Sequence, residues 1–138
     1  MSDSAKWVFL ADPTAYGWNE LNAQKQAVWD GIRNSRAQAN LRKTKAGDLA
    51  LIYHTAPDKA LVGIARITGA ARPDPGNAEL VVVDVVPHRP LARPIPLAEL
   101  KAHAVLSTIG FVRMPRVAVW PVTEAQWNAV LKVSGTRP

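Results

Sequence analysis

Short apolar runs rich in β-branched residues recur along this chain, and their irregular spacing is the feature that most limits its fold. They lie at residues 6–10, 49–54, 61–71, 79–86 and 117–122. Runs of this length predict strands. Regular βαβ units would alternate such strands with helices of similar length, which this spacing does not provide. The pattern favours an α+β fold, with a mixed sheet or open barrel and helices on its flanks.

Two capping boxes predict where helices begin. Ser35 is followed three residues later by Gln38, so a helix is expected from Ser35 to about residue 43. Thr123 and Gln126 form a second capping box. It precedes apolar residues at helical spacing, which predict a final helix.

Proline and glycine positions refine the strand predictions. The segment from Pro87 to Pro96 is proline-rich and therefore predicted to be extended, with Pro94 and Pro96 excluding a central strand position. A short helix is expected at residues 97–104. The valine-rich run before this segment predicts a central strand buried on both faces. Gly63 predicts a bulge or a close backbone approach.

Length and composition narrow the class of protein. The 138 residues predict one domain spanning residues 1–138. Cysteine is absent, which excludes disulfides, thiolate metal sites and cysteine nucleophiles. No signal segment is visible and no apolar run approaches the ~20 residues of a membrane span, so a cytoplasmic protein with no membrane partner is expected. The net charge of +6 favours a polyanion such as nucleic acid, with simple solubility as the equal alternative.

Five of the nine aromatic residues are tryptophans. Trp7, Trp120 and Trp127 lie in apolar patterns and are predicted to be core residues. Trp18 and Trp29 lie in polar loop sequence, where each either covers the core or lines a pocket. Stacking on an aromatic ring stabilises a bound base by about 1–3 kcal/mol, so two such rings suit one base.

Polar residues near these rings are candidates for binding. Arg33 and Asn34 follow Trp29 closely. Asn pairs with base edges and Arg holds phosphates, but for this dipeptide by itself a capping Asn and a solvated Arg are the favoured interpretation. Tyr53 and His54 end a predicted strand, where alternation places them on opposite faces. A single histidine at a strand end is more often structural than catalytic, so a structural role is favoured over catalysis for His54.

Enzyme signatures are missing from the sequence. It contains no Gly-rich phosphate loop, nucleophile elbow or dinucleotide fingerprint, and no HExxH motif, paired-histidine spacing or acidic cluster. We therefore expect neither a metal site nor a cofactor, and no catalytic activity. A metal-independent ribonuclease that uses His54 with Lys45 or Arg33 is the alternative.

Five motifs occur in the order typical of one family. They are Trp7–Leu10 with Ala11–Pro13, Tyr16–Trp18, Trp29–Arg42, Lys45–Asp48 with Tyr53–Thr55, and Arg113–Val117. On these motifs the chain resembles the EVE domain, a PUA-like family related to the YTH and ASCH domains. The similarity covers nearly the whole chain.

The resemblance implies a PUA-like mixed β-pseudobarrel of about five to six strands with flanking helices. It also implies a pocket for a modified base, methylated or hydroxymethylated and flipped out of nucleic acid, with DNA preferred. A separate effector protein would act downstream. The implied base-pocket residues are Trp29, Trp18, Asn34, Tyr53, His54 and Asp12, and the implied phosphate contacts are Arg33, Arg36, Arg116 and Arg42. An RNA-binding or ribonuclease-like protein of ASCH type, and a nucleoside-binding protein, are the alternatives.

The chain departs from the family pattern at several motif positions. Ser35 stands where the family has an aromatic residue, and Arg36 where it has Gln. Asp12 shortens an acidic side chain, and Pro115 and Ala118 replace serines. Because these changes remove groups suited to line a pocket, we expect the base preference to differ from that of a typical member.

Overall fold

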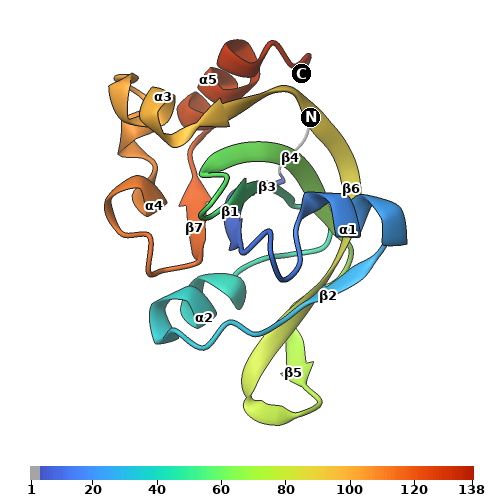
Figure 1. The fold of residues 1–138 in the computed structure, drawn as a ribbon. Coiled ribbons are helices and arrows are strands. Elements are labelled where there is room, and N and C mark those ends of the chain that lie inside the picture. Colours follow the sequence, from blue (N-terminus) through green and yellow to red (C-terminus); the bar gives the residue numbers. More distant parts are fainter. Residues whose placement is uncertain (1–3) are drawn as a thin grey trace.

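One mixed β-sheet curls into a half-barrel, and five α-helices flank it (Figure 1). The computed structural model describes residues 4–138. The strands are β1 (Lys6–Ala11), β2 (Ala27–Trp29), β3 (Leu49–His54), β4 (Ala60–Ile67), β5 (Arg72–Asp74), β6 (Asn77–Pro96) and β7 (Val119–Val122). The helices are α1 (Trp18–Gln24), α2 (Ser35–Leu41), α3 (Leu97–Ala102), α4 (Gly110–Arg113) and α5 (Glu124–Ser134), with a 3-10 turn at Leu106–Thr108. The α+β half-barrel agrees with the prediction.

The strand order mixes local and distant partners. The order is β2-β6-β4-β3-β1-β7, and β5 pairs with β6 beside this path. Strands β1 and β3 are parallel, and the other pairings within residues 4–138 are antiparallel. A parallel pair needs a crossover connection, and here it contains α1, β2 and α2. The C-terminal ends of β1 and β2 and the N-terminal end of α2 are thereby brought together at one side of the sheet.

Strand β6 runs through the proline-rich segment that was predicted to be extended. Its first half lies between β2 and β4, with Val83 paired to Trp29 and Val85 to Ala27. Beyond Val86 it pairs with β4 alone. The prolines therefore occupy an edge, where a missing N–H costs no ladder hydrogen bond. The exclusion of Pro94 and Pro96 from a central position is confirmed, and Figure 1 shows β6 sweeping from β5 to α3.

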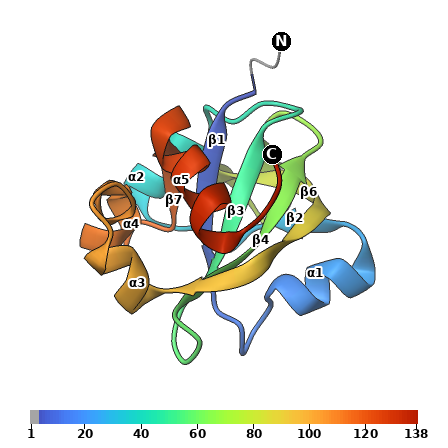
Figure 2. The same cartoon turned by 90° about the horizontal axis from the view of Figure 1, so that it is seen from above.

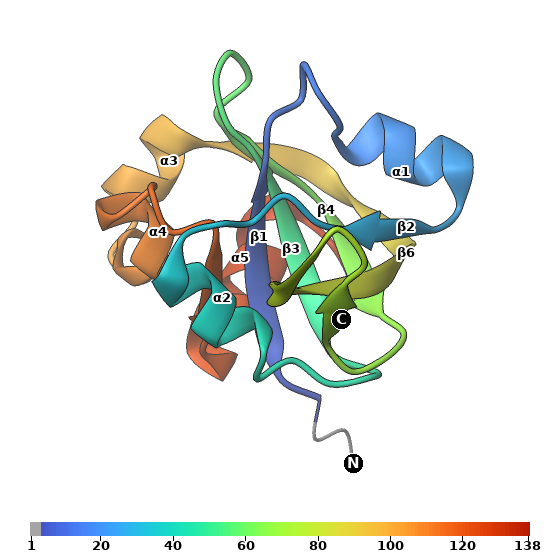
Figure 3. The same cartoon turned by 90° about the horizontal axis from the view of Figure 1, so that it is seen from below.

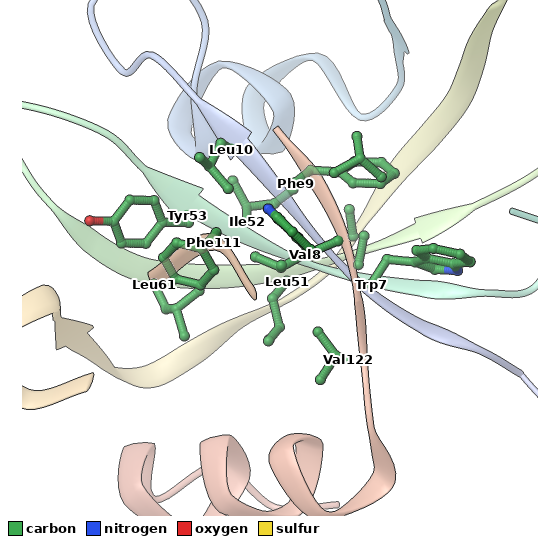
Figure 4. Close-up of a cluster of buried hydrophobic side chains, with 14 of the residues drawn as sticks. Trp7, Val8, Phe9, Leu10, Leu51, Ile52, Tyr53, Leu61, Phe111 and Val122 are labelled. Atoms are coloured by element: carbon green, nitrogen blue, oxygen red, sulfur yellow. The ribbon is translucent and has the colours of Figure 1, made fainter. Parts of the chain in front are cut away.

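The core lies on both sides of β1 and β3. Val8, Phe9, Leu51 and Ile52 are fully buried there (Figure 4). The three tryptophans predicted to be core residues are all more than nine-tenths buried. The buried Asp48 carboxylate lies at the edge of this cluster and accepts hydrogen bonds from the N–H groups of the Trp7 indole, Ala5 and Lys45.

The flanking helices divide between the two sides of the sheet. Helix α1 lies on the opposite flank from α3 and α4 (Figure 2). Helix α5 begins with the predicted capping box of Thr123 and Gln126. The capping box predicted for α2 is wrong, because Asn34 caps the helix by accepting from the Ala37 N–H. Gln38 instead turns inward and bonds the backbone of β6.

Within residues 4–138 there is no helix long and apolar enough to cross a membrane.

Candidate functional site

A cavity of about 590 Å³ opens where three stretches of the chain meet. The end of β1 and the following loop supply one wall, β2 and the loop to α2 supply another, and the segment before β7 supplies the third. Figure 3 shows the connection from β2 to α2 crossing in front of β1. The volume falls in the range typical of small-ligand sites, about 300–1,000 Å³.

Trp29 forms the apolar floor of the cavity. Its ring packs against Phe9 at 5.8 Å between centroids and against Tyr16 at 6.2 Å in an edge-on arrangement. Only 7% of Trp29 is exposed. The contacts with Phe9 and Tyr16 therefore fix the ring, and a ligand touches a limited part of it. The neighbouring Val28 is 45% exposed and adds apolar surface to the same wall.

The loop after β1 is held by its own polar contacts. One Asp12 oxygen accepts hydrogen bonds from the Thr14 hydroxyl at 2.7 Å and the Thr14 N–H at 2.9 Å. These bonds lower the pKa of Asp12, so the carboxylate stays charged. The Tyr16 hydroxyl donates to Gln24 of α1, and burial followed by the Glu20 charge raises its pKa. Both side chains reach the cavity from a loop with a fixed shape.

Charged groups of both signs line the rim. Arg33 and Arg116 are exposed and have no hydrogen-bond or ion-pair partner within the described part of the chain. Asp30 lines the cavity and is likewise unpaired among residues 4–138. Asn34 uses its side-chain oxygen as the cap of α2, which leaves its amide N–H groups for a ligand. The site thus offers donors and acceptors around an apolar floor.

Trp18 and His54 lie away from the cavity, in a structural contact between α1 and β3. The Trp18 backbone N–H donates to His54 Nε2 at 2.9 Å, and His54 Nδ1 lies 2.9 Å from an Asp58 oxygen. The Trp18 ring covers Gly63, where an added Cβ would lie 2.6 Å from the ring. This contact is the close backbone approach predicted at Gly63. The Trp18 and His54 side chains therefore join the helix to the sheet.

Tyr53 is also outside the cavity. Its ring packs on Phe111 with centroids 4.5 Å apart, as Figure 4 shows. Burial raises the pKa of the Tyr53 hydroxyl. The predicted alternation of Tyr53 and His54 meets an irregularity between Ile52 and Tyr53, and both side chains are buried.

Two of the predicted phosphate contacts, Arg36 and Arg42, do not line the cavity. The Arg36 guanidinium stacks on the Trp120 ring at 4.6 Å and points one N–H toward the Met114 sulfur at 3.7 Å. Arg42 donates to the Glu79 carbonyl and is therefore engaged with β6.

Within the part of the chain that the structure covers, no three His, Asp or Glu residues are grouped to hold a metal ion.

The chain matches the family model of the EVE domain over residues 5–133. It belongs to the EVE domain family. Mouse thymocyte nuclear protein 1 is 32% identical over 168 residues, which cover 96% of this EVE chain and 74% of the mouse protein. The NMR structure of Rpa0253 from Rhodopseudomonas palustris has a TM-score of 0.89 at 34% identity, over 95% of this chain and 93% of that one. The crystal structure of the human THYN1 protein in complex with DNA containing 5-methylcytosine has a TM-score of 0.85 at 25% identity, over 98% and 100%.

Two of this EVE chain's departures from the family pattern meet the cavity. Asp12 and Ala118 line it, whereas Ser35 and Pro115 do not. At Ala118 a methyl group stands where the family motif has a hydroxyl. Ala118 therefore adds no side-chain polar group to the wall before β7.

Sequence reasoning missed Tyr16 and Asp30 as cavity residues. Asp30 directly follows Trp29, so its place in the same motif was the available signal. Tyr16 lies in the Tyr16–Trp18 motif, in which Trp18 was the predicted pocket residue. In the structure Tyr16 lines the cavity and Trp18 does not. Trp29, Asn34, Asp12, Arg33 and Arg116 are the predicted residues that the fold does bring together.

Proposed function

We propose that this protein is a non-catalytic module that binds a modified cytosine, flipped out of DNA, in the cavity floored by Trp29. The observation that carries the proposal is the cavity itself, which has a volume of about 590 Å³ and is lined by apolar residues such as Trp29 and by the charged side chains of Asp30, Arg33 and Arg116. The human THYN1 complex with 5-methylcytosine DNA, a relative of the same fold, supports the choice of base and of nucleic acid.

The chemistry of the cavity suits an extruded base. Flipping a base costs a few kcal/mol of stacking, which contacts with aromatic and apolar side chains must offset. Trp29, Tyr16 and Val28 supply such contacts. Arg33 and Arg116 stand on the rim, where the phosphates flanking an extruded nucleotide would pass. Their charges would give the complex its salt dependence.

The geometry around His54 supports a binding role over a ribonuclease role. Both ring nitrogens are engaged, one by the Trp18 N–H and the other by Asp58. A general base needs a free nitrogen within reach of the proton that it removes. RNA incubated with the protein without metal should remain intact, and cleavage lost in His54→Ala would overturn the non-catalytic proposal.

The experiment that tests the proposal is a binding panel. Short DNA duplexes carrying cytosine, 5-methylcytosine, 5-hydroxymethylcytosine or N6-methyladenine at one position are titrated at two salt concentrations. Preference for one modified cytosine at both concentrations supports the proposal. Equal affinity for every duplex, falling steeply with salt, would reduce the protein to a basic surface. Equal affinity for a free nucleoside and for DNA, with little salt dependence, would favour a nucleoside-binding protein.

Trp29→Phe is the matched variant for the floor. Trp29→Ala would remove a buried ring that packs on Phe9 and Tyr16, and such a change costs about 3–5 kcal/mol of stability. Trp29→Phe keeps an aromatic ring and reduces the contact area. We expect it to weaken modified-base binding while Trp127→Phe, a buried change far from the cavity, leaves binding unchanged.

A further inference from the structure

Asp30 differs from the other hydrogen-bond acceptors of the cavity, Asp12, Asn34 and Tyr16, because its side chain has no partner among residues 4–138. One Asp12 oxygen accepts hydrogen bonds from Thr14, the Asn34 side-chain oxygen caps α2, and the Tyr16 hydroxyl donates to Gln24. Both oxygens of Asp30 are unpaired among residues 4–138. Asp30 therefore presents a full hydrogen-bond acceptor to whatever occupies the cavity, next to the Trp29 floor.

A cytosine reader has a chemical problem that this acceptor solves. Thymine carries the same 5-methyl group as 5-methylcytosine, so the methyl group cannot separate the two. They differ at position 4 and at N3: cytosine has an amine donor and an acceptor, whereas thymine has a carbonyl acceptor and an N–H donor. A carboxylate accepts from the cytosine amine and faces the thymine carbonyl as one acceptor against another.

The neighbouring donors complete a pattern that fits the cytosine edge. The amide N–H groups of Asn34 are free to donate. Cytosine presents two acceptors beside its amine, so one carboxylate and adjacent donors match all three groups. When thymine occupies the site, the Asp30 carboxylate loses water without gaining a hydrogen-bond donor. This unpaired charge lowers the affinity for thymine.

We propose that Asp30 is the specificity-determining residue that accepts the exocyclic amine of the bound base and rejects thymine. The inference rests on the proposed function and adds to it: the site takes amino-bearing pyrimidines and excludes keto pyrimidines of the same shape. A site that pairs with one base edge discriminates by about 5- to 150-fold against the wrong edge.

The test compares 5-methylcytosine with thymine in otherwise identical duplexes. The target base is placed opposite an abasic position, so that neither base has a pairing partner to lose and extrusion costs are matched. Affinities are measured for the wild type, Asp30→Asn, Asp30→Ala and Glu124→Gln. The last variant removes one exposed carboxylate on α5 and controls for overall charge. Because any lost carboxylate strengthens binding to DNA in general, the readout is the ratio of the two affinities.

We expect the wild type and Glu124→Gln to prefer 5-methylcytosine by at least about fivefold, and both Asp30 variants to approach a ratio of one. Asp30→Asn is also expected to bind thymine more tightly than the wild type does, because its amide donates to the carbonyl. A preference that survives in Asp30→Ala overturns the assignment and leaves the proposed function standing. A wild type that binds both duplexes equally overturns both.

Discussion

Replacing Gly63 by alanine should destabilise the fold through the Trp18 ring. A Cβ at this position would lie 2.6 Å from the ring carbons Cδ2 and Cε3 of Trp18. Carbon atoms at rest are about 3.5–4.0 Å apart, so the ring must retreat by about 1 Å. The Trp18 backbone N–H donates to His54 Nε2 at 2.9 Å, and this hydrogen bond limits how far the Trp18 side chain can move.

The size of the effect follows from this overlap. Overpacking a filled site costs about 1–3 kcal/mol, and a side chain pushed off its rotamer costs about 0.5–1.5 kcal/mol. Against this, Gly→Ala gains about 0.4–1 kcal/mol by restricting the unfolded chain. We expect a net loss of about 2 kcal/mol in the free energy of unfolding. For a chain of this length the melting temperature should fall by about 4–10 °C.

Urea unfolding of four variants isolates the contact: Gly63→Ala, Gly69→Ala, Trp18→Leu, and Gly63→Ala combined with Trp18→Leu. Gly69→Ala is the matched control, because an added Cβ there meets nothing within 4 Å. In a Trp18→Leu background, which clears the space, Gly63→Ala should lose most of its cost, so the two changes should couple by about 1–3 kcal/mol. The reasoning fails if Gly63→Ala unfolds at the same urea concentration as Gly69→Ala, or if its cost is undiminished beside Trp18→Leu.

Two further predictions concern the buried Gln38 and the exposed His88. Gln38 is 3% exposed, donates to the Ile32 and Val81 carbonyls and accepts from the Val81 N–H. Gln38→Leu should lower the free energy of unfolding by about 1–3 kcal/mol and speed hydrogen exchange at Val81. Unchanged exchange at Val81 would contradict this. Burial, and then Arg89 and Arg66, lower the pKa of His88 below its ordinary 6.5. The unfolded chain therefore binds the proton more readily, so the free energy of unfolding should fall as pH drops below about 6.5. This slope should flatten in His88→Gln, and an identical pH profile would refute the assignment.

The sheet was predictable because its strands carry their own signal. Periodicity and β-branched composition gave β1, β3 and the first half of β6, since burial on both faces selects such residues. Strand β2 carries no such signal. It has three residues, and it pairs with Val83–Val85 only because the crossover returns the chain to that edge. Strand β2 therefore forms through its tertiary pairing with β6, and its own sequence does not predict it.

The division between Trp18 and Trp29 shows why site prediction went only half-way. Both lie in polar sequence, which says that a tertiary contact must bury the ring but not which contact. Gly63 offers Trp18 a surface without a side chain, and the ring settles there. Trp29 ends β2 at the open side of the sheet, beside Phe9. No local pattern distinguishes a ring that meets a glycine from one that meets a cavity.

The cavity has walls taken from residues 10–16, 28–34 and 116–118, so it exists only in the folded chain. A ligand held there binds the native state and not the unfolded one, and its binding free energy adds to the free energy of unfolding. At a ligand concentration 100 times its Kd the gain is about 2.7 kcal/mol. Melting temperature therefore becomes a label-free measure of occupancy. Modified nucleosides and short oligonucleotides can be ranked by the melting temperature of the protein in their presence.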